Sequence, residues 1–288
     1  MQLLETFSPP EGQPLTILPL PDGRRFLTGS EDGGVRLHDL EDGRVLATLA
    51  RHAGPVDELA LDEGTRRVAS AGEDAVVRLS PLEEGVEARE LEGERRVAFA
   101  PGGHHFATLG ADGSLSIFDA DTGARRGRLP AFDRRPQVLA FAPHAGTLFV
   151  GGAGTIHGAA LPDGTFEARL EAHEIQVTDL AISPTQALFG SVGADGRLVF
   201  WTVVGGSQVT EIDLEDRGTP RLVFRPDGRS VLVATASGLT LRSVPDGSAR
   251  GAARLELPGI RALALVPGGE TVLAALDSGE LARVGLPG

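Results

Sequence analysis

The fold is decided by one stretch, AHEIQVTDLAISPTQALFGSVGADGRLVFW, which runs from Ala172 to Trp201. It contains three short apolar runs, separated by a Ser-Pro turn at Ser183-Pro184 and by a tight turn at residues 194–196. Apolar runs of about five to eight residues between Pro, Gly and Asp are typical of short antiparallel strands. We therefore predict three consecutive strands here.

The turn after the first of these strands recurs along the whole chain. Its first residues stand at positions 21, 62, 101, 143, 184, 226 and 267, so successive copies lie 39 to 42 residues apart. A period of about 40 to 45 residues with several strands per copy is typical of β-propellers. Seven copies predict one all-β domain over residues 1–288, a single seven-bladed β-propeller with four-stranded antiparallel blades.

The last copy has no fourth strand of its own. The chain ends soon after the run at residues 281–284, whereas residues 2–7, QLLETF, form a strand-like segment outside all seven copies. An open ring leaves an unpaired strand edge, which favours aggregation. We expect residues 2–7 to complete the last blade and to close the ring.

Four polar side chains in the opening stretch carry a family resemblance. His173, Ser191, Asp195 and Trp201 have the order and approximate spacing of the side chains that form a hydrogen-bonded chain inside a blade of the WD-repeat β-propeller family, which this chain resembles. Three positions of a second set match the same pattern: His52, Ser70 and Asp74. The turn position of this pattern is occupied by Asp32, Asp74, Asp112, Asp195 and Asp277, with Gly154 and Ser237 in the fourth and sixth copies.

His173, Asp195 and Ser191 are also the residue types of a catalytic triad. A nucleophile must face solvent in a pocket, whereas the resemblance implies that these side chains are buried in a blade. We therefore expect structural roles for both sets and no catalytic residue. The resemblance implies a protein-interaction scaffold or adaptor.

The composition excludes several kinds of chemistry. All 27 basic residues are Arg, and Lys and Cys are absent, so a P-loop lysine, a Schiff base, a thiolate nucleophile, a zinc-thiolate site and a disulfide are all excluded. We find no cofactor fingerprint and expect no cofactor. The bias toward Gly, Ala, Arg and Pro is typical of a GC-rich bacterial genome.

The charge and the N-terminus limit the partners. A formal net charge of −13 argues against nucleic-acid and anionic-membrane binding, since phosphate contacts need a positive surface field. The N-terminus lacks a basic segment followed by an apolar run, and no stretch reaches the roughly twenty apolar residues of a membrane span. We expect a cytoplasmic, monomeric protein.

Arginines gather where the chain enters the innermost strand of each copy. They are Arg51, Arg95, Arg96, Arg134, Arg135, Arg217, Arg221 and Arg261. On a propeller these segments meet at the top rim, where guanidinium groups suit the carboxylates of an acidic peptide. In the alternative, neighbouring acids neutralise them: Glu92, Glu94, Asp133, Glu215 and Asp216.

Two further functions stay open beside the scaffold. One is a hydrolase or lyase with a metal in the central channel, which needs inward-facing acids or histidines, whereas the inner strands mostly offer Leu, Ala, Val and Phe. His104, His105 and His144 lie at first turns of neighbouring copies, but adjacent strand residues point to opposite sides, so we predict no metal site. The other is a sensor or regulatory module for a separate bacterial effector.

Overall fold

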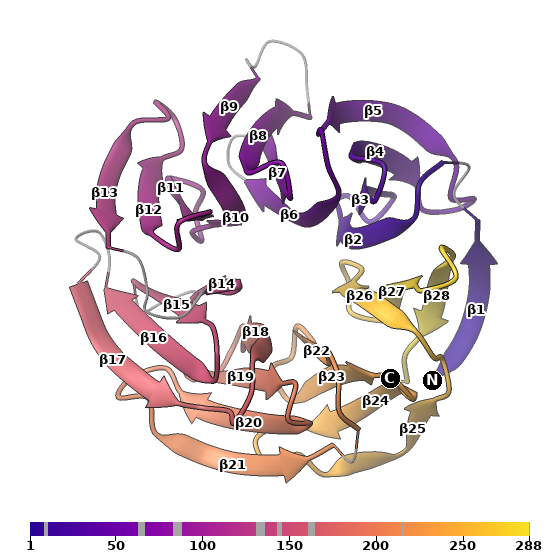
Figure 1. Cartoon of the computed structure of the whole chain (residues 1–288). Helices are drawn as coiled ribbons and strands as arrows, with labels where there is room; N and C mark the ends of the chain where they lie inside the picture. Colours follow the sequence, from indigo (N-terminus) through magenta and orange to yellow (C-terminus); the bar gives the residue numbers. More distant parts are fainter. Residues whose placement is uncertain are drawn as a thin grey trace. The chain divides into compact units, whose positions relative to one another are not determined.

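Seven four-stranded antiparallel sheets make up the described part of the chain, which confirms the predicted all-β, seven-bladed β-propeller (Figure 1). The structure is a computed structural model and describes residues 1–8, 11–62, 67–82, 88–130, 136–142, 146–160, 165–214 and 216–287. Every regular element in these ranges is a strand. The described residues thus contain no helix with the length and apolarity of a membrane span.

One compact unit comprises Leu3–Ala131 and Arg261–Gly285. Its blade 1 consists of β2 (Pro14–Pro19), β3 (Arg25–Ser30), β4 (Gly34–Asp39) and β5 (Val45–Arg51). Blade 2 consists of β6 (Val56–Asp62), β7 (Arg67–Gly72), β8 (Val76–Pro81) and β9 (Arg89–Glu92). Blade 3 consists of β10 (Glu94–Phe99), β11 (His105–Gly110), β12 (Leu115–Asp119) and β13 (Arg125–Leu129). Blade 7 consists of β26 (Ile260–Leu265), β27 (Thr271–Leu276), β28 (Leu281–Gly285) and β1 (Gln2–Phe7).

A second compact unit comprises Met1–Gln2, Phe132–Ile260 and Leu286–Gly288. Its blade 4 consists of β14 (Val138–Phe141), β15 (Thr147–Gly151), β16 (Thr155–Ala160) and β17 (Thr165–Glu171). Blade 5 consists of β18 (Val177–Ile182), β19 (Leu188–Gly193), β20 (Arg197–Thr202) and β21 (Gln208–Asp213). Blade 6 consists of β22 (Arg221–Phe224), β23 (Ser230–Thr235), β24 (Gly238–Ser243) and β25 (Ala249–Leu255). The single domain over residues 1–288 stays a prediction.

The N-terminal strand completes blade 7, as the sequence predicts. β1 is hydrogen-bonded to β28, so the first and last strands of the chain share one sheet (Figure 1). The Phe7 side chain is buried, and the Arg283 guanidinium lies 5.8 Å from the centre of its ring. Arg283 also forms a 3.0 Å ion pair with Glu5. These contacts anchor β1 to blade 7.

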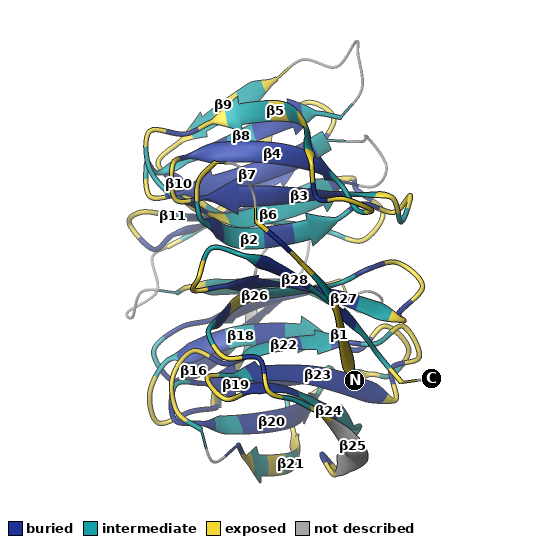
Figure 2. Cartoon of the chain, turned by 90° about the vertical axis from the view of Figure 1, so that its right-hand side faces the viewer, coloured by how far each residue is buried: buried dark blue, intermediate teal, exposed yellow. Residues whose placement is uncertain are grey.

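The hydrophobic core lies between neighbouring blades within each unit. Apolar side chains of blades 4 and 5 form one cluster, in which the rings of Phe149 and Phe189 lie 4.3 Å apart. Blades 2 and 3 share another cluster around Phe106, whose ring stacks on Phe118 at 5.0 Å. Figure 2 shows the resulting burial. Middle strands such as β3 and β4 are largely buried (dark blue), whereas β1 is largely exposed (yellow).

The hairpin between the second and third strands fixes the position of the turn residue. In blades 1, 2, 3 and 5 the strand pairing is centred on Asp32, Asp74, Asp112 and Asp195. In blade 7, Ala274 pairs with Ala282, so the centre is Ser278 and the prediction of Asp277 is wrong by one residue. Gly279 then has the left-handed conformation (φ 86°) that Gly196 has in blade 5 (φ 78°).

Blade 4 also differs from the prediction, which named Gly154 as its turn residue. Gly154 has φ 81°, and a Cβ on it would lie 2.5 Å from the carbonyl oxygen of His173. It therefore occupies the position of Gly196 rather than that of the turn aspartate. A non-glycine side chain does not fit so close to a backbone carbonyl.

Candidate functional site

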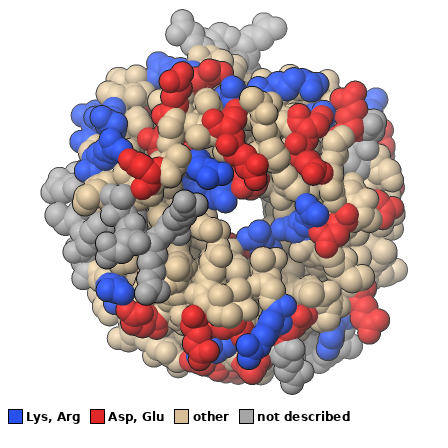
Figure 3. Space-filling view, in the orientation of Figure 1, with Lys and Arg blue, Asp and Glu red and all other residues tan. Residues whose placement is uncertain are grey.

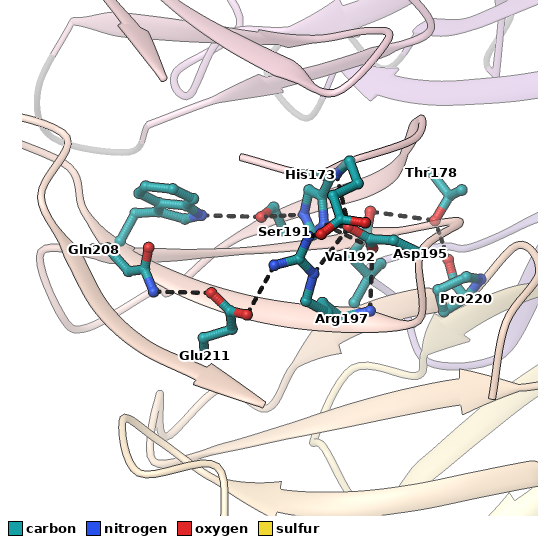
Figure 4. Close-up of polar contacts among 11 residues, drawn as sticks. His173, Thr178, Ser191, Val192, Asp195, Arg197, Gln208, Glu211 and Pro220 are labelled. Carbon is teal, nitrogen blue, oxygen red and sulfur yellow. Dashed lines mark hydrogen bonds and ion pairs between the residues drawn. The ribbon is translucent and has the colours of Figure 1, made fainter. Parts of the chain in front are cut away.

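Blade 5 contains one continuous chain of hydrogen bonds (Figure 4). Nδ1 of His173 lies 3.0 Å from Oδ1 of Asp195, and Nε2 lies 2.8 Å from Oγ of Ser191. The indole N–H of Trp201 donates to the same Oγ at 2.9 Å. All four residues are buried, so the chain links the turn of the blade to its hydrophobic core.

The geometry fixes the protonation of this chain. Burial lowers the pKa of His173, so the imidazole is neutral near pH 7. Its Nδ1–H donates to Asp195, and its Nε2 accepts the Ser191 hydroxyl hydrogen. Burial opposes ionisation of Asp195, yet the N–H of Glu174 and the imidazole hold the pKa of Asp195 below its usual value. Each polar atom of the chain therefore has a partner.

Blade 2 repeats three members of the chain. Nδ1 of His52 lies 2.9 Å from Oδ1 of Asp74, and Nε2 lies 2.8 Å from Oγ of Ser70. The fourth position is occupied by Ser80, which pairs with Val68 as Trp201 pairs with Phe189. Despite the cost of burial, the imidazole, a guanidinium and a backbone N–H hold the pKa of Asp74 at about 2.

Blade 1 builds a variant of the chain from different side chains. His38 occupies the position of Trp201, with Nε2 2.8 Å from Oγ1 of Thr28 and Nδ1 3.0 Å from the carbonyl oxygen of Gly43. Arg36 is 1% exposed and binds Asp32, holding the pKa of that carboxyl at about 2. The blade thus keeps a buried polar chain without the leading histidine.

The His–Ser–Asp sets have the connectivity of a catalytic triad but not its access. Ser191 is 0% exposed and Ser70 is 1% exposed. The Ser191 hydroxyl also accepts the indole N–H of Trp201. A nucleophile in this position meets no substrate, so the arrangement stabilises the blade.

Sequence reasoning missed an arginine and a glutamate that extend the chain. In blade 5, Arg197 donates from Nε to Asp195 at 3.1 Å and from Nη1 to Glu211 at 2.9 Å. In blade 2, Arg78 joins Asp74 and Glu90 with the donor atoms exchanged, from Nη1 to Asp74 at 2.7 Å and from Nε to Glu90 at 2.9 Å. Both glutamates stand 16 positions after the turn aspartate, and this repeated spacing is the signal that reveals them.

Two of the predicted rim arginines contact the preceding blade. Arg96 of blade 3 forms a 2.7 Å ion pair with Asp57 of blade 2. Arg221 of blade 6 donates to the carbonyl oxygen of Thr178 in blade 5 at 2.8 Å, beside Asp179. These contacts differ from the alternative named above, because the neutralising acids lie in the neighbouring blade and not beside the arginines in sequence.

Two acids near these arginines also accept a backbone N–H across the blade interface: Asp179, and Glu58, which forms a 3.7 Å ion pair with Arg96. Glu58 accepts the N–H of Val97 at 3.2 Å, and Asp179 accepts the N–H of Leu222 at 2.9 Å. Val97 and Leu222 each follow the arginine of the pair. We call this arrangement the inter-blade clasp, and it joins blade 2 to blade 3 and blade 5 to blade 6.

The remaining rim arginines are placed as follows. Arg51, Arg95 and Arg217 are exposed, and Arg261 forms an ion pair with Asp277. Arg134 and Arg135 lie outside the described residues, as do Asp133, Glu215 and His144. On the face drawn in Figure 3, basic side chains (blue) commonly have acidic side chains (red) beside them. A docking patch made of the rim arginines stays a prediction.

The described ranges contain no group of three or more His, Asp or Glu residues placed to hold a metal ion. His104 is exposed and His105 is half-buried. His104 precedes β11, and His105 is the first residue of that strand.

Two segments of the chain match the family model for the WD domain, G-beta repeat: residues 2–39 and residues 164–202. The second contains the complete chain of blade 5, and the first contains Thr28, Asp32 and His38 of blade 1. The matched segments are therefore the copies in which a side chain of the third strand completes the hydrogen-bonded chain.

Three curated relatives contain related sequence. The chain is 24% identical over 225 residues to the Periodic tryptophan protein 2 homolog of Dictyostelium discoideum, which covers 77% of this chain and 21% of that protein. It is 24% identical over 202 residues to the WD repeat-containing protein slp1 of Schizosaccharomyces pombe, covering 63% and 40%. It is 28% identical over 95 residues to the DENN domain and WD repeat-containing protein SCD1 of Arabidopsis thaliana, covering 33% and 8%.

The chain thus spans less than half of the length of each of these relatives. All three come from eukaryotes, so the bacterial origin suggested by the composition stays a prediction. The family match and the relatives together support a WD-repeat propeller.

Proposed function

We propose that this WD-repeat propeller is a non-catalytic scaffold that holds a protein partner. One observation carries the proposal: the residues that most resemble catalytic machinery, the two His–Ser–Asp sets, are closed inside blades and saturated with hydrogen bonds. The polar groups of these sets hydrogen-bond to one another and so stabilise the blades. We therefore assign the function to the exposed surface of the protein. The relatives named as WD-repeat proteins are consistent with a role in binding.

We place the docking surface where innermost strands begin in the unit that contains blades 1, 2, 3 and 7. Arg51 ends β5 and Arg95 lies at the start of β10, and both are exposed. Guanidinium groups pair with carboxylates through two parallel hydrogen bonds, which favours an acidic peptide as the partner segment. The net charge of −13 limits this attraction to the local patch, because long-range forces repel an acidic partner.

Binding of a fluorescent Glu-rich peptide, measured by anisotropy at low salt, tests this surface. The double variant Arg51→Glu, Arg95→Glu should weaken binding about tenfold or more, corresponding to about 1.4 kcal/mol or more. The matched control is Arg44→Glu, Arg125→Glu, which changes the net charge equally at exposed arginines near the hairpins between third and fourth strands. Equal weakening in both variants would contradict a defined patch.

The monomeric state and the cytoplasmic location are part of the same proposal. Sedimentation equilibrium of the purified chain checks the first, and fractionation of the native cells checks the second. A stable dimer would move the docking surface to the faces left free by the second copy.

A further inference from the structure

Blade 6 has an open pocket where blades 2 and 5 hold their polar chains. Its volume is about 640 Å³. The polar residues that line it are Asp213, Asp216, Thr235, Ser237, Thr240, Arg242 and Arg254. The apolar walls include Leu214 and Val233. All of these residues belong to the unit that contains blades 4, 5 and 6.

The strand pairing shows what has been replaced. Val233 pairs with Thr240 as Ser191 pairs with Val199, so Val233 stands in the position of the serine. The turn residue in this hairpin is Ser237, where blade 5 has Asp195. The residue 22 positions earlier, where blade 5 has His173, is Glu215, which lies outside the described residues. Blade 6 therefore has neither the aspartate nor the histidine nor the serine of the chain.

Two arginines occupy the remaining positions of the chain. Arg242 pairs with Val231 as Trp201 pairs with Phe189, which places it in the tryptophan position. Arg254 pairs with Thr240 as Glu211 pairs with Val199, which places it in the glutamate position. The aromatic ring and the outer acid of blade 5 have thus become two guanidinium groups that line one pocket.

Ser237 separates positive from negative charge inside the pocket. Its hydroxyl accepts a 3.3 Å hydrogen bond from Nη2 of Arg254, and its backbone N–H donates to Oδ2 of Asp216 at 2.8 Å. Nη1 of Arg242 donates to the carbonyl oxygen of Gly247 at 3.0 Å, which fixes the direction of that side chain. The pocket therefore presents a basic wall from β24 and β25.

A second part of the lining, the acidic wall, contains Asp213 and Asp216. Asp213 ends β21, and Asp216 follows in the segment that leads into β22. Leu214, between them, is buried and its N–H donates to the carbonyl oxygen of Gly196 at 2.8 Å, so this wall is tied to the turn of blade 5. Two acids and two arginines give the described lining a formal charge of zero.

We propose that the blade 6 pocket binds a small zwitterion. Its acid group, a carboxylate or a phosphate, lies against Arg242 and Arg254, where paired guanidinium groups provide forked hydrogen bonds. Its ammonium group lies against Asp213 and Asp216. The hydroxyls of Ser237 and Thr240 provide further hydrogen bonds between the two ends. This site is independent of the scaffold function proposed above.

Charge and volume decide between ligand classes. The two acids would repel a ligand that carries only negative charge, and the two arginines would repel a ligand that carries only positive charge. Neither kind of ligand therefore suits a lining of zero charge. The volume lies in the range of about 300 to 1,000 Å³ that is typical of small-molecule sites. A small zwitterion satisfies both walls at once.

Isothermal titration calorimetry of the full chain tests the proposal with three probes. O-phosphoserine carries phosphate, carboxylate and ammonium groups, whereas inorganic phosphate and ethanolamine each carry one sign of charge. We expect O-phosphoserine to bind at least about tenfold more tightly than either single-charge probe. Free glutamate, which has no phosphate, distinguishes a carboxylate ligand from a phosphate ligand.

Two variants and one control locate the binding. Arg254→Gln should weaken binding of O-phosphoserine about tenfold by removing one guanidinium. Thr240→Phe should weaken it similarly by filling the pocket, and it carries the test if Arg254→Gln does not fold. Arg44→Gln removes an exposed arginine of blade 1 and should leave binding unchanged.

Four outcomes would overturn the proposal. They are no saturable binding of O-phosphoserine or glutamate, binding that neither pocket variant changes, binding that Arg44→Gln weakens as strongly, and inorganic phosphate binding as tightly as O-phosphoserine. A Glu-rich hexapeptide that binds more tightly than the zwitterions and is lost in Arg254→Gln would make the pocket a peptide subsite and would also overturn the assignment.

Discussion

At the residue scale, Ala75 stands in a conformation that suits glycine. Its φ is 56°, whereas the equivalent turn positions of blades 1, 3 and 5 are occupied by Gly33, Gly113 and Gly196, with φ between 78° and 83°. A left-handed conformation costs an L-residue about 1 to 2 kcal/mol, and part of this is offset by the greater entropy that glycine loses on folding.

We predict that Ala75→Gly raises the free energy of unfolding by about 0.5 to 1 kcal/mol, measured by urea denaturation. Ala236→Gly is the matched control, because Ala236 is an exposed turn alanine outside the left-handed region. It should lower stability slightly. A loss of stability in Ala75→Gly would show that the turn is not strained.

Glu94 is a buried acid in blade 3, beside the buried hydroxyls of Thr108 and Ser116. Burial raises the pKa of Glu94. The hydroxyls of Thr108 and Ser116 and the charge of Arg128 oppose this rise, and nearby Asp112 adds to it. As pH rises above the ordinary pKa, the unfolded state releases this proton first, so stability falls with rising pH through the window up to the raised pKa.

Glu94→Gln should therefore raise the free energy of unfolding at pH 7 by about 1 to 2 kcal/mol and change it little at pH 4. Urea denaturation at the two pH values measures both effects. A gain of equal size at both would rule out the titration of Glu94 as the cause.

Sequence spacing located the polar chains of blades 2 and 5 because both the hairpin and the segment before it keep their length there. The same spacing gave the wrong turn residue in blade 7, where the hairpin is centred on Ser278 and not on Asp277. It also gave no role to Arg78 or Arg197, because these arginines stand at different distances after their turn aspartates and reach the same carboxylate.

At the element scale, blade 5 differs from blade 2 chiefly in its aromatic member. The Trp201 ring is buried, stacks on Phe189 at 6.2 Å and donates its N–H to Ser191. We predict that Trp201→Ala lowers the free energy of unfolding by about 3 to 5 kcal/mol. Ser80→Ala at the equivalent position of blade 2 should cost less than about 1 kcal/mol, because it removes only a hydroxyl. Chemical denaturation of both variants gives the comparison, and similar losses would mean that the indole is not part of the core.

β1 is the other element whose removal has a defined cost. Deleting residues 1–8 removes the buried Phe7 ring and leaves the edge of β28 unpaired. We predict a loss of at least about 3 kcal/mol, seen as a clear fall in Tm, and a greater tendency to aggregate. Leu4→Ser, at a half-exposed position of the same strand, should change Tm little. An unchanged Tm after the deletion would refute the role of β1 in blade 7.

The seven blades were predictable because a turn of similar composition follows each first strand at a nearly constant period. The strand register inside the blades was harder to predict from the sequence. Blades 4 and 6 pair Val150 with His157 and Val233 with Thr240, one residue closer in sequence than the equivalent pairs of blades 1, 2, 3 and 5. A count of positions therefore assigns Ser243 to the place that Arg242 occupies, which is why the blade 6 pocket was invisible in the sequence.

At the scale of the whole molecule, acidification should destabilise the protein in two steps. Burial lowers the pKa of His52 and His173. Below about pH 6.5 these histidines therefore bind protons in the unfolded chain but not in the folded chain. Stability is then lost by up to about 1.4 kcal/mol per pH unit for each histidine until the folded pKa is reached. Asp32 and Asp74, with pKa values held at about 2, add a second loss below about pH 4.

Urea denaturation at pH 7, 6 and 5 measures the first step. The double variant His52→Asn, His173→Asn should be less stable at pH 7 but should lose less stability between pH 7 and pH 5 than the wild type. The same slope in both proteins would assign the first step to other groups.

The charge of the whole molecule was easier to predict than its distribution. The acidic total is a matter of composition, but the pairing of Arg96 with Asp57 and of Arg221 with the region of Asp179 depends on which strands become neighbours. These partners lie about one copy apart in sequence, so the acids adjacent to Arg96 and Arg221 in the sequence do not identify them. Among the described rim arginines, Arg51 and Arg95 are exposed in one unit, and Arg217 is exposed in the other.

The closure of each polar chain within one blade and the segment leading into it has an evolutionary consequence. A chain built by duplication holds several copies of the same arrangement, and a mutation that removes the arrangement from one copy leaves the others intact. Blade 6 lacks the arrangement, yet it has four strands and packs against blade 5. A protein of this architecture can thus acquire a cavity with new chemistry by letting one redundant repeat diverge, with no insertion and no change in the order of its strands.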